Sequence, residues 1–307
     1  MKIDNFAISN FMACPAKFKL RMIDGWTARR RSAALGFGSV LHEALAAWYK
    51  TGNPVKGLEA INENWPDAHP VDDYRTKAKC AEVFLAYVKH YPAETFSIVG
   101  MPDTPQIEVT FTLETGMYLP CDCGWEDHNK WDRYCGGCGK EKEQIEYGGI
   151  FDGLVEFASN VYVLEHKSTS QLGAYYFNQF KPNNQVTGYT WAGGKLTGGR
   201  VAGAIINAIG VYKASATKFL REITTRSTFE VDEWLENLYN VCVQIKDCER
   251  RGYWPMYTPS CTQYGKCEYH DIHVLGHPVE REKRLEQDYV KSTWSYEHRD
   301  LEVPASE

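Results

Sequence analysis

Two short runs of alternating side chains near the middle of the chain constrain the fold more than any other feature. GGIFDGLVEF (148–157) and VYVLEHK (161–167) both have the two-residue periodicity of β-strands, and only Ala-Ser-Asn separates them. So short a connection joins antiparallel neighbours, because parallel strands need a much longer crossover. The two runs therefore predict a β-hairpin. Since strand side chains alternate between faces, Glu165 and Lys167 share a face with Val163.

Helical patterns flank this hairpin on both sides. GSVLHEALAAWYK (38–50) has an apolar stripe with helical spacing, and Ser39 is its expected N-cap. Further helices are expected over 7–22, 55–65, 72–91, 183–195 (ending near Gly193-Gly194) and 230–254, and further strands over 106–114, 201–211 and 218–224. This order predicts an α/β fold with a mixed central β-sheet flanked by helices.

The expected division of the chain follows these patterns. We expect a helical N-terminal part (1–105), a core that contains the sheet (106–230), a long helix with a cysteine-containing C-terminal segment (231–278) and a charged tail (279–307). Residues 119–143 are cysteine-rich and polar, and they lie between two expected strands. We therefore predict that they are an insertion into the core.

Composition excludes some classes of protein and favours metal binding. With 34 basic and 40 acidic residues the net charge is −6, which excludes a strongly basic nucleic-acid coat protein but allows a local basic groove. The N-terminus lacks a signal-peptide pattern and no apolar run is long enough to span a membrane, so we expect a cytoplasmic protein. In a reducing compartment, ten cysteines are more often metal ligands than disulfides.

The hairpin also places charged groups close together. Folding it brings Asp152 beside Glu165, and two carboxylates in an apolar setting repel each other. A divalent cation such as Mg²⁺ removes that conflict, because it binds carboxylate oxygens while keeping several waters. Lys167 would point to the same place, where it could orient a water or stabilise charge on a phosphate. The alternative is an ordinary salt bridge between Glu165 and Lys167 on a solvated face.

Several motifs resemble one nuclease family. GGIFDGLVEF…VYVLEHKST resembles the core motif of the PD-(D/E)xK nuclease superfamily, although Phe151 stands where the superfamily's name has proline. The flanking motifs resemble its RecB-like exonuclease branch, which includes CRISPR-associated RecB-like exonucleases and phage relatives. GFGSVLHEALAAWY matches the branch's glycine-then-histidine helix with His42, and NNQVTGYTWA matches its Q-x-x-x-Y motif with Gln185 and Tyr189. The motifs follow the family's order over roughly residues 8–275.

The resemblance implies a restriction-endonuclease-like core and an Mg²⁺- or Mn²⁺-dependent deoxyribonuclease. It implies that the metal is bound by His42, Asp152, Glu165 and the backbone carbonyl of His166. It also implies that Lys167 helps to activate the attacking water, and that Gln185 and Tyr189 position the nucleic-acid backbone or support the site.

The expected activity is that of an exonuclease on single-stranded DNA or DNA ends, with a DNA-processing or recombination protein as a candidate partner. The alternative is a catalytically silent nucleic-acid-binding or assembly subunit with the same fold. A binding module has no need of Asp152, Glu165 and Lys167 together, so their presence favours the enzyme. Lys17, Lys19, Arg21 and the arginines at 29–31 are candidates to line a groove for the phosphate backbone.

One set of cysteines joins the two ends of the chain. In the RecB-like branch, an N-terminal Cys-Pro and three C-terminal cysteines hold a [4Fe–4S] cluster, and NFMACPAKF and PSCTQYGKCEYHDIH resemble these segments with Cys14, Cys261 and Cys267. His273 stands where the family has its last cysteine. A three-cysteine, one-histidine cluster, a Cys3His zinc site, or Cys248 as the fourth ligand all remain open. We favour His273 as the ligand and leave the metal open.

A second set lies within the insertion. CDCGWEDHNKWDRYCGGCG places Cys121, Cys123, Cys135 and Cys138 at a spacing that favours a small structural zinc site resembling a zinc knuckle, with His128 as a substitute for one cysteine. The insertion is also a candidate contact for substrate or partner. Cys80 and Cys242 are expected to be core residues.

Overall fold

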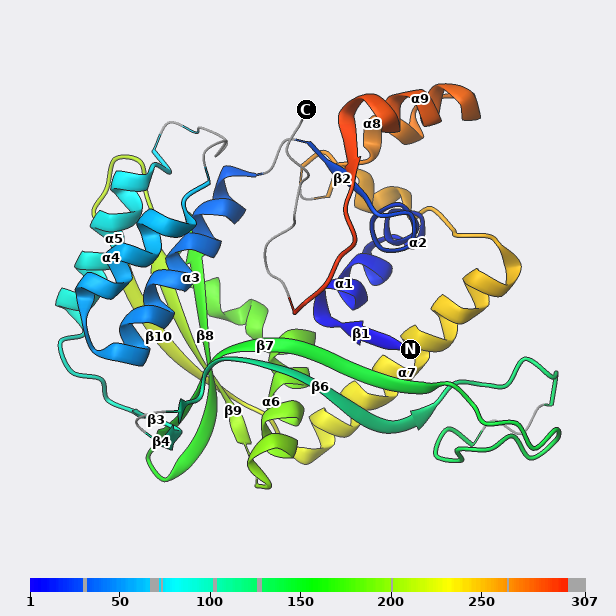
Figure 1. The fold of residues 1–307 in the computed structure, drawn as a ribbon, viewed down its shortest axis with the longest axis horizontal. Coiled ribbons are helices and arrows are strands. Elements are labelled where there is room, and N and C mark those ends of the chain that lie inside the picture. Colours follow the sequence, from blue (N-terminus) through cyan, green and yellow to red (C-terminus); the bar gives the residue numbers. More distant parts are fainter. Residues whose placement is uncertain are drawn as a thin grey trace. The chain divides into compact units, whose positions relative to one another are not determined.

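The computed structural model of the chain describes residues 1–29, 32–66, 72, 74–101, 104–125, 129–199, 201–263 and 265–297. The chain forms two compact units, and each is assembled from separate stretches of sequence. Unit 1 comprises Met1–Arg29, Phe111–Gly149 and Glu233–Glu307, and unit 2 comprises Arg30–Thr110 and Ile150–Asp232. Two long strands, β6 (Ile107–Tyr118) and β7 (Gln144–Phe157), pass from one unit into the other (Figure 1).

Unit 2 contains the predicted hairpin and most of a mixed sheet. Strand β7 pairs antiparallel with β8 (Asn160–Thr169), β8 pairs parallel with β9 (Val201–Gly210), and β9 pairs antiparallel with β10 (Lys218–Thr225). Ala158 and Ser159 form the hairpin turn with φ of 47° and 62°, as a tight primed turn requires. The expected α/β fold with a mixed central sheet flanked by helices is therefore confirmed.

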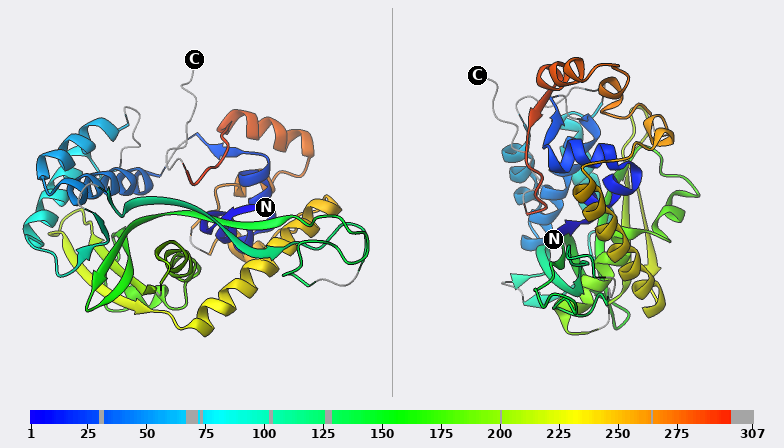
Figure 2. Two further views of the ribbon diagram at one scale, coloured as in Figure 1. Left: turned by 60° about the horizontal axis from the view of Figure 1, so that its bottom comes forward. Right: turned by 90° about the vertical axis from the view of Figure 1, so that its right-hand side faces the viewer.

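Helices cover both faces of this sheet (Figures 1 and 2). One layer contains α3 (Ala33–Thr51), α4 (Pro54–Asn64) and α5 (Lys77–His90), whose buried side chains form an apolar core together with Ile209 and Val211. The opposite layer contains α6 (Asn184–Thr197), which contacts β8 and β9. The smaller elements of the unit are β3 (Ser97–Ile98), which pairs with β7, β4 (Gly100–Met101) paired with β5 (Thr104–Pro105), and a 3-10 turn, η2 (Tyr176–Phe180).

Several helix ends differ from the sequence expectation, and the long helix expected to reach residue 254 ends at Arg251. Helix α3 begins at Ala33, so Ser39 lies inside the helix and the N-cap residue is Ser32. Helix α5 begins only at Lys77, because the Thr76 side chain accepts a hydrogen bond from the Lys79 N–H and caps it there. Helix α6 runs through Gly193-Gly194 to Gly198, where φ is +61°. A Cβ on Gly193 would lie 3.2 Å from Val201, so this glycine allows close packing of the helix on β9.

Unit 1 holds both the N-terminal and the C-terminal segments of the chain. Its elements are β1 (Lys2–Asp4), α1 (Asn5–Ala13), α2 (Pro15–Phe18), a π-helical turn η1 (Lys19–Ile23), β2 (Trp26–Ala28), most of α7 (Thr228–Arg251), a 3-10 turn η3 (Thr258–Cys261), α8 (His270–His273), α9 (Pro278–Asp288) and β11 (Tyr289–Lys291). The segment expected to be a charged tail thus starts as a helix, and β11 pairs antiparallel with β2. Residues 298–307 of that tail lie outside the described residues.

Apolar contacts close this unit around the N-terminal helices. The rings of Phe11, Phe18 and Trp254 pack against one another with centroids 5.4 to 6.4 Å apart. Asp4 caps α1 by accepting a hydrogen bond from the Ala7 N–H. The indole N–H of Trp294 donates to the same carboxylate. Among the helices described, none is long and apolar enough to cross a membrane.

Candidate active site

Helix α3 and the strands β6 and β7 together place three possible metal ligands side by side in unit 2. His42 on α3, Glu108 on β6 and Asp152 on β7 offer ligand atoms that all lie within 4.8 Å of one another. His42 Nδ1 is 3.1 Å from Asp152 Oδ1, and the side chain of Asp152 is only 2% exposed. A nitrogen with two carboxylate groups suits a hard divalent cation such as Mg²⁺ or Mn²⁺.

Gly38, one helical turn before His42, allows α3 to approach the sheet this closely. A Cβ at this position would lie 3.1 Å from the Ser168 hydroxyl on β8. The glycine-then-histidine motif therefore has a structural explanation. The glycine allows the helix to pack closely on the strand, and the histidine side chain then reaches the carboxylate of Asp152.

Glu108 was expected only as part of a strand. Its backbone has φ of 53°, a left-handed conformation that costs a non-glycine residue about 1–3 kcal/mol. The surrounding sheet holds it there, with its carboxylate beside His42 and Asp152. Sequence alternation could not identify this residue, because a strand pattern assumes extended backbone throughout.

Glu165 and Lys167 project from β8 toward α6, where they meet Gln185. Lys167 Nζ donates to Glu165 Oε1 and, at 3.0 Å, to Gln185 Oε1. The Gln185 amide in turn donates to Glu165 Oε1 at 3.1 Å, which closes a triangle of hydrogen bonds. Glu165 is thus hydrogen-bonded to its neighbours, and among the residues described it does not belong to the group formed by His42, Glu108 and Asp152.

Burial and mutual attraction shift the protonation of this pair. Burial raises the pKa of the Glu165 carboxyl above its ordinary value, and repulsion from Asp152 adds to the rise. Burial alone would lower the pKa of Lys167, but attraction to the Glu165 carboxylate outweighs it and raises that pKa. Lys167 is therefore a charged hydrogen-bond donor at neutral pH, which suits orientation of a water or stabilisation of charge rather than proton abstraction.

His166 contributes to this site through its backbone. Its N–H donates to Asp152 Oδ2 at 2.7 Å, while its ring lies on the other face of the sheet. There Asn207 Nδ2 lies 2.6 Å from His166 Nδ1, and the ring stacks on Tyr49 with centroids 5.6 Å apart. The imidazole is thus buried away from Glu165 and Lys167, as expected, and the predicted role of its carbonyl stays a prediction.

A buried polar network continues from Asn207. Its amide donates to the Tyr87 hydroxyl at 2.8 Å, and its oxygen accepts from Arg221 Nε at 3.0 Å. Arg221 pairs with Glu94 through both terminal nitrogens. Asn207 is fully buried, so this network fixes the strand beside His166. A single asparagine in the apolar run VAGAIINAIGV is the signal that could have identified it.

Tyr189, the second member of the Q-x-x-x-Y motif, is a packing residue in this structure. It is 8% exposed, and its ring meets Phe151 edge-on with centroids 5.1 Å apart. Its position supports the strand that carries Asp152. This arrangement favours the supporting role among the two that the resemblance implied.

The insertion in unit 1 gathers its four cysteines. Cys121 and Cys138 have sulfurs 3.6 Å apart, Cys123 and Cys135 have sulfurs 3.4 Å apart, and all four lie within 4.8 Å of one another. Tetrahedral zinc with bonds of about 2.3 Å separates its sulfurs by about 3.8 Å, so the set could hold this ion. Backbone N–H groups, that of Cys138 first, lower the pKa of Cys135 to about 6. The alternative ligand His128 lies outside the described residues.

The other predicted ligand set is less compact. Cys14, Cys261, Cys267 and His273 all belong to unit 1, but these four described residues do not form a group within 4.8 Å. Cys14 Sγ accepts a hydrogen bond from the Tyr257 N–H at 3.4 Å, and the Cys267 N–H donates to the Cys261 carbonyl. Cys248 is buried on α7. The cluster and its fourth ligand stay a prediction, whereas Cys80 and Cys242 are core residues as expected.

The N-terminal basic residues that the structure describes are held by contacts within unit 1. Arg21 is 3% exposed and its guanidinium lies over the stacked rings of Phe6 and Trp294, so it is inaccessible to a phosphate backbone. Lys17 pairs with Glu268, and Lys19 pairs with Asp24. Arg29 donates to backbone carbonyls at the end of α9. Arg30 and Arg31 lie outside the described residues.

Comparisons with known proteins agree with this geometry. The crystal structure of a protein from Eubacterium rectale, named "Putative exonuclease", aligns with a TM-score of 0.51 and 11% identity over 90% of each chain, which shows a shared fold. A search of curated proteins gave no significant match. The family model of the PD-(D/E)XK nuclease superfamily matches residues 6–272. Since this match covers most of the sequence, the chain belongs to the PD-(D/E)XK nuclease superfamily.

Proposed function

We propose that the protein is a divalent-metal-dependent deoxyribonuclease that hydrolyses phosphodiester bonds of single-stranded DNA or DNA ends. The observation that carries the proposal is the adjacency of two groups in unit 2. One is the ligand set of His42, Glu108 and Asp152, and the other is the triangle of Glu165, Lys167 and Gln185. A structural salt bridge would need neither the histidine nor the strained glutamate.

Each residue has a defined task in this proposal. His42, Glu108 and Asp152 would hold Mg²⁺ or Mn²⁺, with Glu165 and the His166 carbonyl nearby. When bound, the cation supplies Lewis-acid stabilisation of the charge that develops on the phosphate. Asp152 is kept in place by the His166 N–H.

The charged Lys167 has three N–H donors, of which Glu165 and Gln185 use two. Its side chain is 30% exposed. The third N–H is therefore available to orient the attacking water or to donate to a phosphate oxygen. Gln185 accepts from the lysine and donates to the glutamate, so it fixes the relative position of both.

Exonuclease action is proposed because the chain shares its fold with the Eubacterium rectale protein, which is named an exonuclease. An exonuclease requires an end, so linear strands should be degraded to short products while covalently closed circular single strands remain intact. Degradation of the circles would favour an endonuclease instead.

The test is cleavage of end-labelled DNA by wild type, Lys167→Ala and a control, Lys195→Ala, with Mg²⁺, with Mn²⁺ and with EDTA. Lys195 is an exposed lysine on α6, so its loss controls for removal of a positive charge. Wild type and the control should cleave with metal, and Lys167→Ala should lose roughly 10²-fold or more in rate. Inert wild type would support the silent binding subunit, and full activity of Lys167→Ala would refute the assigned site.

We propose zinc as the ion of the insertion. Four thiolates at tetrahedral spacing, one with a pKa lowered toward neutrality, suit a structural zinc site. About one zinc per chain, lost in Cys138→Ser, is the expected result of metal analysis. The [4Fe–4S] cluster or second zinc at Cys14, Cys261, Cys267 and His273 rests on the resemblance, and the colour and iron content of anaerobically purified protein test it.

A further inference from the structure

The stretch of chain that follows Glu165 is unusual in its charge. Between His166 and Arg221 there is no aspartate or glutamate, although the chain as a whole is acidic. At the overall frequency of 40 acidic residues in 307, a stretch of this length would hold about seven. The same stretch holds seven basic residues: Lys167, Lys181, Lys195, Arg200, Lys213, Lys218 and Arg221. Lys167, Lys181 and Arg221 are paired with Glu165, Glu230 and Glu94, whereas Lys218 lines the pocket described next, where a positive charge suits an anionic ligand.

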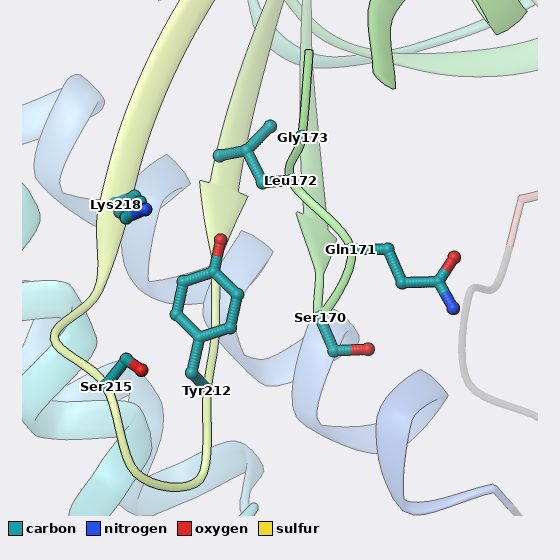
Figure 3. A pocket seen from close by; sticks show the side chains of 7 residues that line it. All are labelled: Ser170, Gln171, Leu172, Gly173, Tyr212, Ser215 and Lys218. Atoms are coloured by element: carbon teal, nitrogen blue, oxygen red, sulfur yellow. The ribbon is translucent and has the colours of Figure 1, made fainter. Parts of the chain in front are cut away.

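A pocket of about 370 Å³ lies within this stretch (Figure 3). One wall is the segment 170–173, which continues from β8, and the other comprises Tyr212, Ser215 and Lys218 around the start of β10. Leu172 points toward the strand that carries Lys218, whereas Gln171 points away from it (Figure 3). The volume lies at the lower end of the range for small-ligand sites, about 300–1,000 Å³, which fits one nucleotide.

One aromatic ring lines this pocket, and a second lies two residues along the chain from its wall. Tyr212 lines it, and a Cβ on Gly210 would lie only 2.5 Å from the Tyr212 hydroxyl, so the glycine leaves room for the ring. Tyr175, two residues beyond the pocket wall, is 83% exposed. So large an exposed ring contributes nothing to the core, whereas a nucleobase can stack on it.

The pocket is close to the proposed catalytic lysine. Ser170 follows Lys167 by three residues at the end of a strand, which corresponds to about 10 Å. Tyr176, three residues beyond the pocket wall, lies close enough to Lys167 and Glu165 to interact electrostatically with both. A single DNA strand with one phosphate at Lys167 would therefore place a neighbouring nucleotide in the pocket.

From these observations we infer a nucleotide-binding subsite for a single strand, formed by the pocket and the exposed ring of Tyr175. Lys218 binds a backbone phosphate, while Tyr175 and Tyr212 stack on bases. This inference rests on the proposed function and deepens it, since stacking on splayed bases selects single strands over duplexes.

The experiment measures binding separately from cleavage. Fluorescence anisotropy with a labelled oligothymidylate is recorded in EDTA at several salt concentrations for wild type, Tyr175→Ala, Lys218→Ala and the control Lys195→Ala. Tyr175→Ala should weaken binding roughly tenfold. Lys218→Ala should weaken it and reduce the slope of log affinity against log salt by about 0.7, the value for one phosphate contact on a single strand. The control, from the same acid-free stretch but outside the pocket, should match wild type.

Each outcome separates the subsite from the nuclease. Unchanged binding by both variants, alongside intact metal-dependent cleavage, overturns the subsite but not the proposed function. If both variants bind the oligonucleotide more weakly and the wild-type protein does not cleave DNA, the subsite is supported and the proposed nuclease activity is refuted. If both variants lose as much affinity for a blunt-ended duplex as for the single strand, the single-strand assignment is overturned. If both variants lose as much affinity for an RNA strand of the same length, the pocket is supported but DNA is not its specific ligand.

Discussion

The two ligand groups of this protein are built on opposite physical principles. In unit 2, His42, Glu108 and Asp152 project from a helix and two strands that hold one another by sheet pairing and packing. In unit 1, four cysteines lie in a loop between β6 and β7, and two of them, Cys123 and Cys138, are exposed. The first group is positioned by the fold, so a metal bound there would contribute to catalysis and not to folding. The second has little core of its own, so a metal would supply its structure.

Removal of zinc from the insertion is the largest effect that this comparison predicts. A structural zinc site contributes an apparent binding free energy of about 10–16 kcal/mol, so chelation or Cys138→Ser should unfold the loop. Trypsin should then cut rapidly at Lys130, Arg133 and Lys140, while the melting of unit 2 is unchanged. An insertion that resists trypsin without zinc would show that both groups are positioned by the fold.

Neutralising a ligand in unit 2 should have the reverse outcome. Asp152→Asn keeps the shape and an acceptor for the His166 N–H, so we expect a normal melting temperature. Loss of the charge should cost about 4 kcal/mol in the transition state, roughly a 10³-fold fall in cleavage rate, with weaker Mn²⁺ binding by calorimetry. Glu156→Gln, an exposed carboxylate on the same strand, should behave as wild type. Unfolding of Asp152→Asn would contradict positioning by the fold.

The buried network behind His166 should have an intermediate effect on both stability and rate. Asn207→Ala leaves His166, Tyr87 and Arg221 without a shared partner, which should destabilise unit 2 by about 2 kcal/mol. A shifted His166 backbone should also slow cleavage about tenfold, as loss of outer-shell support does elsewhere. Denaturant titration and single-turnover kinetics measure the two effects. Stability loss with an unchanged rate would limit the network to a packing role.

Relief of strain at Glu108 should change stability less than loss of the Asn207 network does. Glu108→Gly removes the penalty of φ at 53° and should stabilise unit 2 by about 1 kcal/mol while cleavage falls. Glu108→Gln keeps the strain, so its melting temperature should match wild type while its activity is also reduced. Equal activity of all three proteins would remove Glu108 from the ligand group and leave the strain unexplained.

Much of the fold could be predicted because its signals are local. The alternation of apolar and polar side chains and a three-residue connection were enough to predict the β7–β8 hairpin. Four closely spaced cysteines were enough to predict the compact cysteine group in the insertion. Glu108 and Asn207 were missed, because their roles depend on a backbone conformation and on neighbours distant in sequence. The contacts of Lys17 and Arg29 could not be predicted for the same reason, because their partners, Glu268 and the end of α9, lie more than 240 residues away.

The hydrogen bond from the His166 amide to Asp152 should make the resonance of this amide sensitive to events at the carboxylate. The pairing of β7 with β8 reaches only Gly153 and Leu164, and the His166 amide proton is donated to a carboxylate. Its nuclear magnetic resonance frequency therefore follows the charge on that oxygen. A cation or a proton arriving at Asp152 should move this one peak before any structural change occurs, which makes the His166 amide a built-in spectroscopic sensor of the site.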